Sequence, residues 1–278
     1  MKIGLFDSGY GGLTILEKCR KLMPEYDYIY LGDNARAPYG SRSFDIVYQF
    51  TRQAVKTLFD MGCHLVILAC NTASAKALRT IQQNDLPIWG PERRVLGIIR
   101  PTVEIIGGMT KTRHVGILAT VGTIHSDSYR LEIEKLCPDV TVTGEACPLW
   151  VPIVENNECD TDGAGFFVKK NLDNLFGKDP KIDTIILGCT HYPLLMDKIK
   201  QYVPENVTVL PQGEYVARSL KEYLTRHPEI ESCCSKQASC EYFTTENPEK
   251  FRESAWIFIH EDIKVGKLQL DTLWKGIE

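Results

Sequence analysis

Two segments of the chain, HLVILACNTA at residues 64–73 and TIILGCTHYP at residues 184–193, share one order of residue types. Each begins with an aliphatic run that does not alternate with polar residues, which is typical of a parallel strand buried on both faces. Each run ends in a cysteine, Cys70 or Cys189, and continues into polar residues and a helical pattern. The likeness between the two segments predicts two similar α/β halves.

The same order of strand and helix recurs along most of the chain. Alternating short strands and helices predict parallel βαβ units. Eight such units could also close into one barrel, but the two similar segments favour two open sheets. We expect strands near residues 2–6, 28–31, 65–69, 95–99, 115–119, 141–143, 184–187 and 207–210, and helices near residues 13–22, 44–61, 73–83, 126–136, 163–176 and 194–203. Residues 240–245 are strand-like, and the sequence from about residue 260 carries no strong signal.

Composition excludes several classes of protein. The 278 residues carry 32 Lys and Arg against 36 Asp and Glu, a net charge of −4, and no long basic run. A nucleic-acid surface needs a basic stripe, so we expect no nucleic-acid partner. No stretch approaches the ~20 apolar residues that span a bilayer, and the start, MKIGLFDSGYGG, lacks the apolar length of a signal peptide. We therefore expect no membrane partner and a cytoplasmic location.

The ten cysteines occur without a CxxC pair. In a cytoplasmic chain they are expected as reduced thiols. Without CxxC spacing, the sequence offers no support for a zinc ribbon or a thioredoxin-type redox site. Most of these cysteines are interpreted as small buried residues.

Ligands of open parallel sheets bind at the carboxyl ends of the strands, so the residues directly after each expected strand are candidates. Asp33 follows a strand, but we interpret it as a solvated turn residue. The glycines at 9, 11 and 12 match neither GxGxxG nor a P-loop, and a tight turn explains them equally well. The remaining candidates are small, polar or reactive: Asp7 with Ser8, Cys70 with Asn71 and Thr72, Thr120 with Thr123, and Cys189 with Thr190 and His191.

The two thiols are the most reactive of these candidates. We expect both Cys70 and Cys189 to face a helix N-terminus, where the helix dipole favours an anion. A free thiol has a pKa of ~8.5, and lowering it to ~7 takes about 2 kcal/mol, the upper end of what a helix terminus offers. Asp7 and His191 are charged neighbours that could tune or orient the thiols. One such cysteine is more often core filler, but two in matched settings favour a chemical role.

Six segments, in order along the chain, resemble the glutamate racemases of the cofactor-independent aspartate/glutamate racemase superfamily. They are IGLFDSGYGGLTIL (3–16), YLGDNARAPYGSRS (30–43), VILACNTASA (66–75), ATVGTIHSDSY (119–129), CPLWVPIVE (147–155) and TIILGCTHYPLL (184–195). The later YFTTENPEKFRESA (242–255) is similar to the family's C-terminal stretch.

This resemblance implies two pseudo-symmetric α/β domains, each a mostly parallel sheet flanked by helices, with the active site in the cleft between them. It places residues 1–99 and 210–278 in one discontinuous domain and residues 100–209 in the other. It also implies interconversion of L- and D-glutamate without pyridoxal phosphate or any metal, and D-glutamate as a building block of bacterial peptidoglycan. A homodimer is expected.

By the same resemblance, Cys70 and Cys189 are the two acid/base residues, and Asp7 and His191 are the helpers beside them. Two like groups suit a reversible inversion, because the acid and the base must exchange roles. The resemblance places the substrate's amino and α-carboxylate groups at Ser8, Asn71, Thr72 and Thr190, and its side-chain carboxylate at Tyr39 and Gly40. Thr120, Thr123 and Glu155 fall in family motifs with less defined roles.

The chain departs from the family pattern at several positions. Tyr10 stands where a small aliphatic residue is common, and Asn34 stands where Thr is common. The segment GIIRPT has Arg100 in place of an acid, after an apparent insertion at residues 91–97. The segment 232–239, with its two adjacent cysteines, has no match in the family.

Other functions remain as alternatives. An aspartate or hydantoin racemase would use the same mechanism on a different substrate, although the residues of the PYG and GCTHYPLL segments favour glutamate. A two-domain binding protein would need no paired thiols and usually carries an export signal. A Cys–His hydrolase built on Cys189 and His191 would leave Cys70 unexplained.

Overall fold

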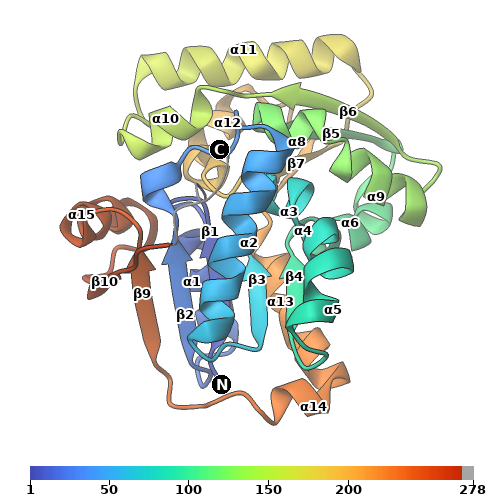
Figure 1. The fold of residues 1–278 in the computed structure, drawn as a ribbon. Helices are drawn as coiled ribbons and strands as arrows, with labels where there is room; N and C mark the ends of the chain where they lie inside the picture. Colours follow the sequence, from blue (N-terminus) through green and yellow to red (C-terminus); the bar gives the residue numbers. More distant parts are fainter. Residues whose placement is uncertain (271–278) are drawn as a thin grey trace, which may run out of the picture.

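The computed structural model describes residues 1–270 and shows two parallel sheets flanked by helices (Figure 1). In the described residues, the first sheet has six strands in the order β10-β9-β2-β1-β3-β4, and the second has four in the order β6-β5-β7-β8. Every strand pairing in both sheets is parallel. The predicted α/β class with two open parallel sheets is confirmed, and the single barrel is excluded.

Every strand expected from the sequence overlaps an observed strand. The strands are β1 (Ile3–Asp7), β2 (Tyr28–Gly32), β3 (Leu65–Leu68), β4 (Arg94–Gly97), β5 (His114–Ala119), β6 (Thr141–Ala146), β7 (Thr184–Gly188), β8 (Thr208–Leu210), β9 (Cys240–Thr244) and β10 (Val265–Lys267). The short β10 lies where the sequence carries no strong signal, and it forms by pairing with β9.

The observed helices include five of the six expected ones, a divided sixth, and several that the sequence did not indicate, the longest of them at Gly213–Arg226. They are α1 (Leu13–Leu22), α2 (Phe44–Asp60), α3 (Asn71–Lys76), α4 (Leu78–Thr80), α5 (Leu86–Trp89), α6 (Ile99–Glu104), α7 (Ile106–Met109), α8 (Val121–His125), α9 (Ser128–Leu136), α10 (Trp150–Glu155), α11 (Asp162–Lys178), α12 (Met196–Tyr202), α13 (Gly213–Arg226), α14 (Pro228–Glu231) and α15 (Pro248–Ile259). The expected single helix at 73–83 is instead divided among α3, α4 and a π-helical turn, Ile81–Asp85. No proline or glycine in that range marks the breaks.

The chain builds the first four strands in one sheet, the next four in the other, and then returns to the first sheet. The return places β9 beside β2, so the C-terminal segment lies against the start of the chain. The apparent insertion at residues 91–97 contains β4, the edge strand of the first sheet. We keep the domain division 1–99 with 210–278 and 100–209 as a proposal; residues 271–278 of it lie outside the described part of the chain.

One hydrophobic core is shared between the two sheets. The core cluster that contains Leu5 of the first sheet also contains Leu187 of the second. Helices α1 and α13 pack against each other and contribute Leu13 and Val216 to the same cluster. Burial of apolar surface therefore holds the two sheets in one relative position.

A buried polar ring strengthens this connection. Gln212, which is 2% exposed, accepts a hydrogen bond from Asn71 Nδ2 (2.6 Å) and donates one to the hydroxyl of Tyr129 (2.7 Å). Tyr129 in turn donates to Asn71 Oδ1 (2.7 Å). Buried polar groups need such partners, so the ring fixes the side chain of Asn71 beside Cys70.

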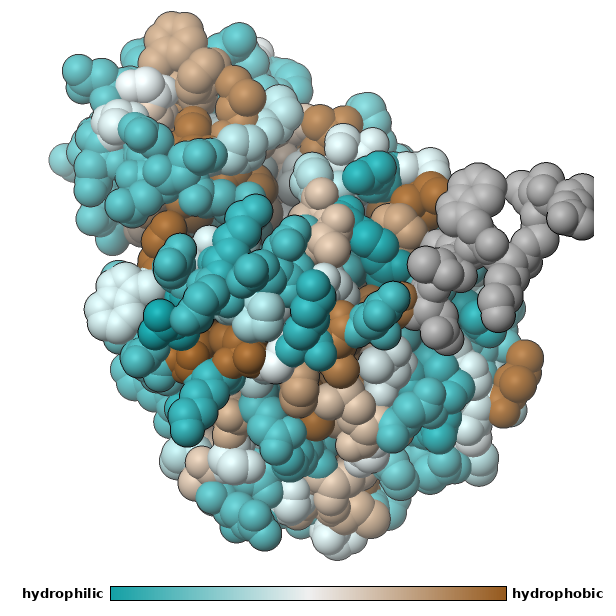
Figure 2. Space-filling model, turned by 60° about the vertical axis from the view of Figure 1, so that its left-hand side comes forward, coloured by the Kyte–Doolittle hydropathy of each residue, from teal (hydrophilic) through white to brown (hydrophobic). Residues whose placement is uncertain are grey.

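The surface shows no broad apolar face on the side of α15. Figure 2 shows mostly hydrophilic residues there, with hydrophobic residues in small separate patches. Arg100 lies on the surface of α6 and pairs with Glu104 (2.9 Å). Within residues 1–270, no helix combines the length and the apolar character needed to cross a membrane.

Asp183 anchors the strand that leads to Cys189, and its removal should destabilise the fold. This carboxylate, 8% exposed, accepts hydrogen bonds from Thr110 Oγ1 (2.6 Å) and from the backbone N–H groups of Lys111 (2.7 Å) and Thr112 (2.8 Å). Although burial opposes it, these bonds lower the pKa of Asp183 to about 2. We expect Asp183→Ala to lower the free energy of unfolding at pH 7 by about 2–3 kcal/mol in urea titrations.

The pH dependence of this difference has a definite sign. Because the folded pKa lies below the unfolded value of ~3.9, the stabilisation is complete above pH ~4 and is lost as the pH falls toward 2. Asp173→Ala, which removes an exposed pair with Lys169, is the control and should change stability by less than ~1 kcal/mol. Equal losses in both variants would contradict the anchoring role.

Candidate active site

A cavity of about 520 Å³ opens where the carboxyl ends of the two sheets face each other. Strands β1 and β3 of the first sheet and β5 and β7 of the second end at it. All but one of the residues singled out in the sequence line this cavity: Asp7, Ser8, Tyr39, Gly40, Cys70, Asn71, Thr72, Thr120, Glu155, Cys189, Thr190 and His191. The exception is Thr123, whose hydroxyl lies behind the wall and is bonded to Thr120 (3.1 Å) and Thr72 (3.3 Å).

Cys70 is the N-cap of α3, as expected from the sequence. Its Sγ accepts a hydrogen bond from the backbone N–H of Ala73 (3.4 Å) and lies 3.4 Å from Ser8 Oγ. The expected lowering of its pKa does not occur. Burial, followed by the charge of Asp7, raises the pKa of Cys70 to about 12 and outweighs the two hydrogen bonds. At neutral pH Cys70 is therefore a thiol.

Cys189 differs from the expectation in its local structure. The helix after Cys70 begins at the next residue, whereas the 3-10 turn after Cys189 begins three residues further on, at Tyr192–Leu195. Cys189 therefore does not cap a helix. Its Sγ instead lies 3.8 Å from Nδ1 of His191. The polar partner of this thiol is thus a side chain rather than a helix terminus.

His191 is held between a thiol and a carboxylate. Its Nε2 lies 2.9 Å from Glu155 Oε1, at the end of α10, and its ring meets Phe258 of α15 edge-on at 5.3 Å. Burial alone would lower the pKa of His191, but the hydrogen bonds with Cys189 and Glu155 raise it to about 10. At neutral pH His191 is therefore an imidazolium that donates to both partners.

Asp7 provides the corresponding charge near Cys70. It ends β1, is almost fully buried, and accepts a hydrogen bond from the backbone N–H of Gly9 (2.8 Å). Burial raises the pKa of Asp7 above its usual value, while the charge of His191 opposes this shift. The two thiols therefore have different neighbours, an acid beside Cys70 and a cation beside Cys189.

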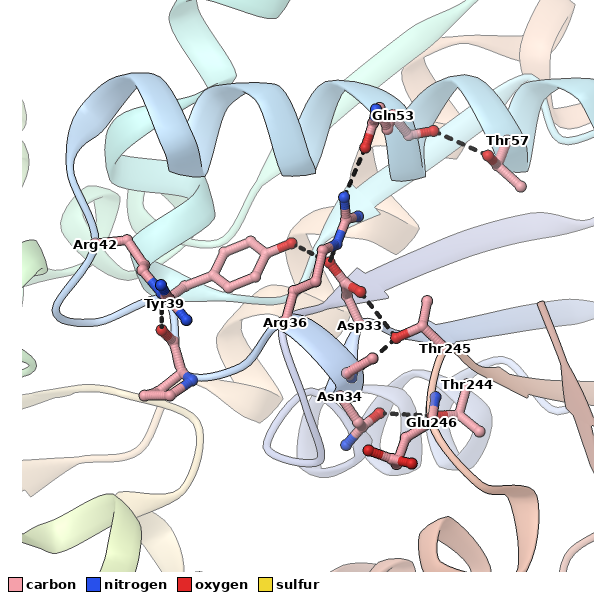
Figure 3. A network of polar contacts seen from close by, with 12 residues as sticks. Asp33, Asn34, Arg36, Tyr39, Arg42, Gln53, Thr57, Thr244, Thr245 and Glu246 are labelled. Carbon is pink, nitrogen blue, oxygen red and sulfur yellow. Dashed lines mark hydrogen bonds and ion pairs between the residues drawn. The ribbon is translucent and has the colours of Figure 1, made fainter. Parts of the chain in front are cut away.

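The interpretation of Asp33 as a solvated turn residue is wrong. Asp33 is 0% exposed, and its Oδ2 accepts a hydrogen bond from the hydroxyl of Tyr39 (2.5 Å; Figure 3). Sequence alone could not show this, because two of the donors around Asp33 come from parts of the chain that fold back onto it. The Tyr39 hydroxyl therefore already donates its proton in a hydrogen bond to Asp33.

Several lining residues were not predicted as site residues. Cys147 follows β6, which extends to Ala146 rather than ending near residue 143 as expected, so a correct strand end would have identified it. Tyr10 and Asn34, noted only as departures from the family pattern, also line the cavity. The C-terminal segment, whose position depends on tertiary folding, adds Glu246, Lys250 and Ser254. Within residues 1–270, no cluster of three or more His, Cys, Asp or Glu side chains is placed to hold a metal ion.

Known proteins are similar to this chain in sequence and in fold. The model of the Asp/Glu/Hydantoin racemase family matches residues 13–220. A glutamate racemase from Ruegeria sp. (strain TM1040) is 39% identical over 273 residues, which is 95% of this chain and 98% of that protein. The structure of a glutamate racemase isoform from Bacillus anthracis superposes with a TM-score of 0.88 at 35% identity and covers 97% of both chains. A glutamate racemase from Francisella tularensis, solved in complex with D-glutamate, superposes with a TM-score of 0.86 at 31% identity over 97% of this chain and 98% of that one.

These matches identify the chain as a racemase, a class of isomerase. The chain belongs to the Asp/Glu/hydantoin racemase family. The relatives and structures described above are glutamate racemases, and they match this chain over nearly its whole length.

Gly11 is the point where the two halves approach most closely beside the thiols. A Cβ at this position would lie 2.3 Å from Thr190 Oγ1 and 2.4 Å from His191 Nδ1. We expect Gly11→Ala to displace His191 and to lower the racemase kcat/KM on the order of 100-fold, since misplacement by about 1 Å has effects of this size. Gly177→Ala, in α11 with no described atom within 4 Å of the new Cβ, is the control. Similar kcat/KM values for the two variants would contradict this account of the close approach.

The pairing of His191 with Glu155 gives a second prediction. Glu155→Gln removes the carboxylate, so the pKa of His191 should fall from about 10 toward its ordinary value. An NMR titration of the His191 ring measures this directly, with the exposed Glu158→Gln as control. Since the folded pKa exceeds the unfolded value of ~6.5, the linked stability is present below pH ~6.5 and is lost as the pH rises through about 10. An unchanged His191 titration in Glu155→Gln would contradict the role of Glu155.

Proposed function

We propose that this protein interconverts L- and D-glutamate by cofactor-independent transfer of the α-proton between two cysteines. The observation that carries the proposal is the presence of Cys70 and Cys189 in one cavity, each at the carboxyl end of a strand in a different sheet. The charge of Cys189 contributes to the pKa shift of Cys70, so the two sulfurs lie within electrostatic reach of each other. The matches to glutamate racemases support the choice of substrate.

Inversion at the α-carbon needs a base on one face and an acid on the other. One cysteine, as thiolate, takes the α-proton, so an S–H bond forms and the electron pair of the broken C–H bond is delocalised into the α-carboxylate. The other cysteine, as thiol, then gives its proton to the opposite face of the carbon and becomes a thiolate. The reverse reaction exchanges these two roles, which explains why the two groups are alike.

The charges around the two cysteines differ, and we assign the cysteines different starting roles on that basis. The imidazolium of His191 lies 3.8 Å from Cys189 Sγ, and we assign Cys189 the role of base in one direction of the reaction. Cys70 begins as the thiol, because burial and Asp7 raise its pKa. An ammonium group bound beside Asp7 would offset that negative charge, which lets Cys70 serve as the base in the other direction.

The rest of the cavity is suited to an amino acid with two carboxylates. We assign the amino and α-carboxylate groups to Ser8, Asn71, Thr72 and Thr190, whose hydroxyl and amide groups can stabilise the charge that develops on the carboxylate. Tyr39 and Gly40 hold the side-chain carboxylate. Thr120, Thr123 and Glu155 support these contacts: the two threonines bond to Thr72, and Glu155 bonds to His191.

The cellular setting is part of this proposal. We propose that the enzyme supplies D-glutamate for peptidoglycan, acts in the cytoplasm and forms a homodimer. These three points rest on the resemblance of the sequence segments to the family. Size-exclusion chromatography with light scattering tests the dimer.

The decisive test follows the α-proton. Purified protein is incubated with L-glutamate in D₂O without added cofactor, and optical rotation and α-deuterium are both recorded. We expect rotation to be lost while deuterium enters the α-position. Cys70→Ser and Cys189→Ser should each lower the rate by about 10²- to 10⁴-fold, because a serine hydroxyl is a far weaker acid than a thiol. Cys159→Ser, which changes a half-buried thiol away from the cavity, should keep the wild-type rate.

The other outcomes are equally informative. Exchange with aspartate or a hydantoin but not with glutamate would keep the mechanism and change the substrate. No exchange with any of the three substrates, in folded and reduced protein, would overturn the two-cysteine mechanism. Full activity in either cysteine variant would also contradict it.

A further inference from the structure

A buried carboxylate outside the cavity connects to one of its walls. Asp33, directly after β2, is fully buried and accepts three side-chain hydrogen bonds (Figure 3). Its Oδ2 accepts from Arg36 Nε (2.7 Å) and from the hydroxyl of Tyr39 (2.5 Å). Its Oδ1 accepts from Thr245 Oγ1 (2.8 Å). A carboxylate with this many donors is a rigid point of attachment.

The Tyr39 side chain can only be a donor in this network. Burial, and then the neighbouring charge of Asp33, raise the pKa of Tyr39 well above its usual value, so the hydroxyl stays protonated. Phe6 and Phe50 pack against the ring, with centroid distances of 6.2 and 5.7 Å. The aromatic contacts confine the ring, and the bond to Asp33 fixes its far end.

Tyr39 belongs to a loop whose main chain is also held on other sides. The carbonyl of Gly40 accepts a hydrogen bond from the backbone N–H of Gly122 (2.7 Å), which follows the second sheet's β5. The carbonyl of Arg42 accepts from Lys76 Nζ (2.5 Å) on α3. The loop thus lies between the two halves, and Tyr39, Gly40 and Ser41 all line the cavity.

Thr245 brings the C-terminal segment into the same network. Its hydroxyl donates to Asp33 and accepts from the backbone N–H of Ala35 (3.0 Å), while its own N–H donates to the carbonyl of Gly32 (3.1 Å). This places residues far apart in the sequence around one carboxylate, as Figure 3 shows. The next residue, Glu246, lines the cavity.

We propose that Asp33 is a positioning residue. It holds the hydroxyl of Tyr39 and thereby fixes the main chain of residues 39–41 against the substrate's side-chain carboxylate. The hydrogen bond from Thr245 helps to hold Asp33 in place. This inference rests on the proposed function. A binding loop needs such support because affinity for a carboxylate depends on donors that are already in place before the ligand arrives. The Tyr39 hydroxyl itself makes no contact with substrate in this account.

The test compares two tyrosine variants. Tyr39→Phe removes the hydroxyl that bonds to Asp33 and keeps the ring, whereas Tyr48→Phe removes a hydroxyl that bonds to Asp85 (2.8 Å) on the far side of α2. Loss of a hydrogen bond to a charged group corresponds to roughly a ten- to hundredfold effect. We expect KM for L-glutamate to rise by that factor in Tyr39→Phe, kcat to change less than threefold, and both kinetic parameters to stay at the wild-type level in Tyr48→Phe.

Two further variants keep the result unambiguous. Thr245→Val should also raise KM, as Tyr39→Phe does, because it removes another of the three side-chain donors to Asp33. Asp33→Asn should raise KM further if it folds; if it does not fold, the other two variants carry the test. Thermal unfolding midpoints are recorded for every variant.

Specific outcomes would overturn the inference. An unchanged KM in folded Tyr39→Phe would do so, as would a fall in kcat with KM unchanged. If the wild-type protein racemises glutamate, either result contradicts the positioning role of Asp33 and leaves the proposed function in place. An inactive wild type would instead count against the proposed function, so the two failures can be told apart.

Discussion

Two groups that act on opposite faces of one carbon must come from separate elements held at a fixed separation, and this requirement governs the whole structure. Here the carboxyl ends of two parallel sheets face each other, and each sheet carries one of the two proposed acid/base cysteines, Cys70 or Cys189, to the cavity. The separation is maintained by a core common to both sheets and by the buried ring of Gln212, Asn71 and Tyr129. A single sheet could not do this, because its strand ends point the same way.

The two cysteines have similar sequence settings but different electrostatic surroundings. Cys70 lies in a helix N-cap beside a buried acid, whereas Cys189 lies beside an imidazolium that Glu155 holds in its charged form. This asymmetry gives Cys70 a raised pKa and gives Cys189 a cationic neighbour, so the two proposed acid/base groups differ in their surroundings. The helix terminus at Cys70 is the smaller effect, since burial outweighs it.

The C-terminal segment has more influence on the site than its sequence indicates. It returns to the first sheet as β9 and β10, supplies Thr245 to Asp33, and packs Phe258 against His191. Tyr10, a departure from the family pattern, stacks on the same phenylalanine at 6.0 Å. The substitution at residue 10 is thus matched by an aromatic contact from a helix almost 250 residues later in the chain.

The local sequence determined nine of the ten described strands, the helices α1, α2, α9, α11 and α12, and the residues at the strand ends, because hydrophobic periodicity and the polar residues that follow it are short-range properties. That was enough to identify Cys70, Cys189, Asp7 and His191 as candidates. Only the tertiary structure decided which charges surround each thiol, that Asp33 is buried rather than solvated, and that the C-terminal helix lines the cavity. Burial and long-range contacts set these features, and they depend on chain segments that become neighbours only after folding.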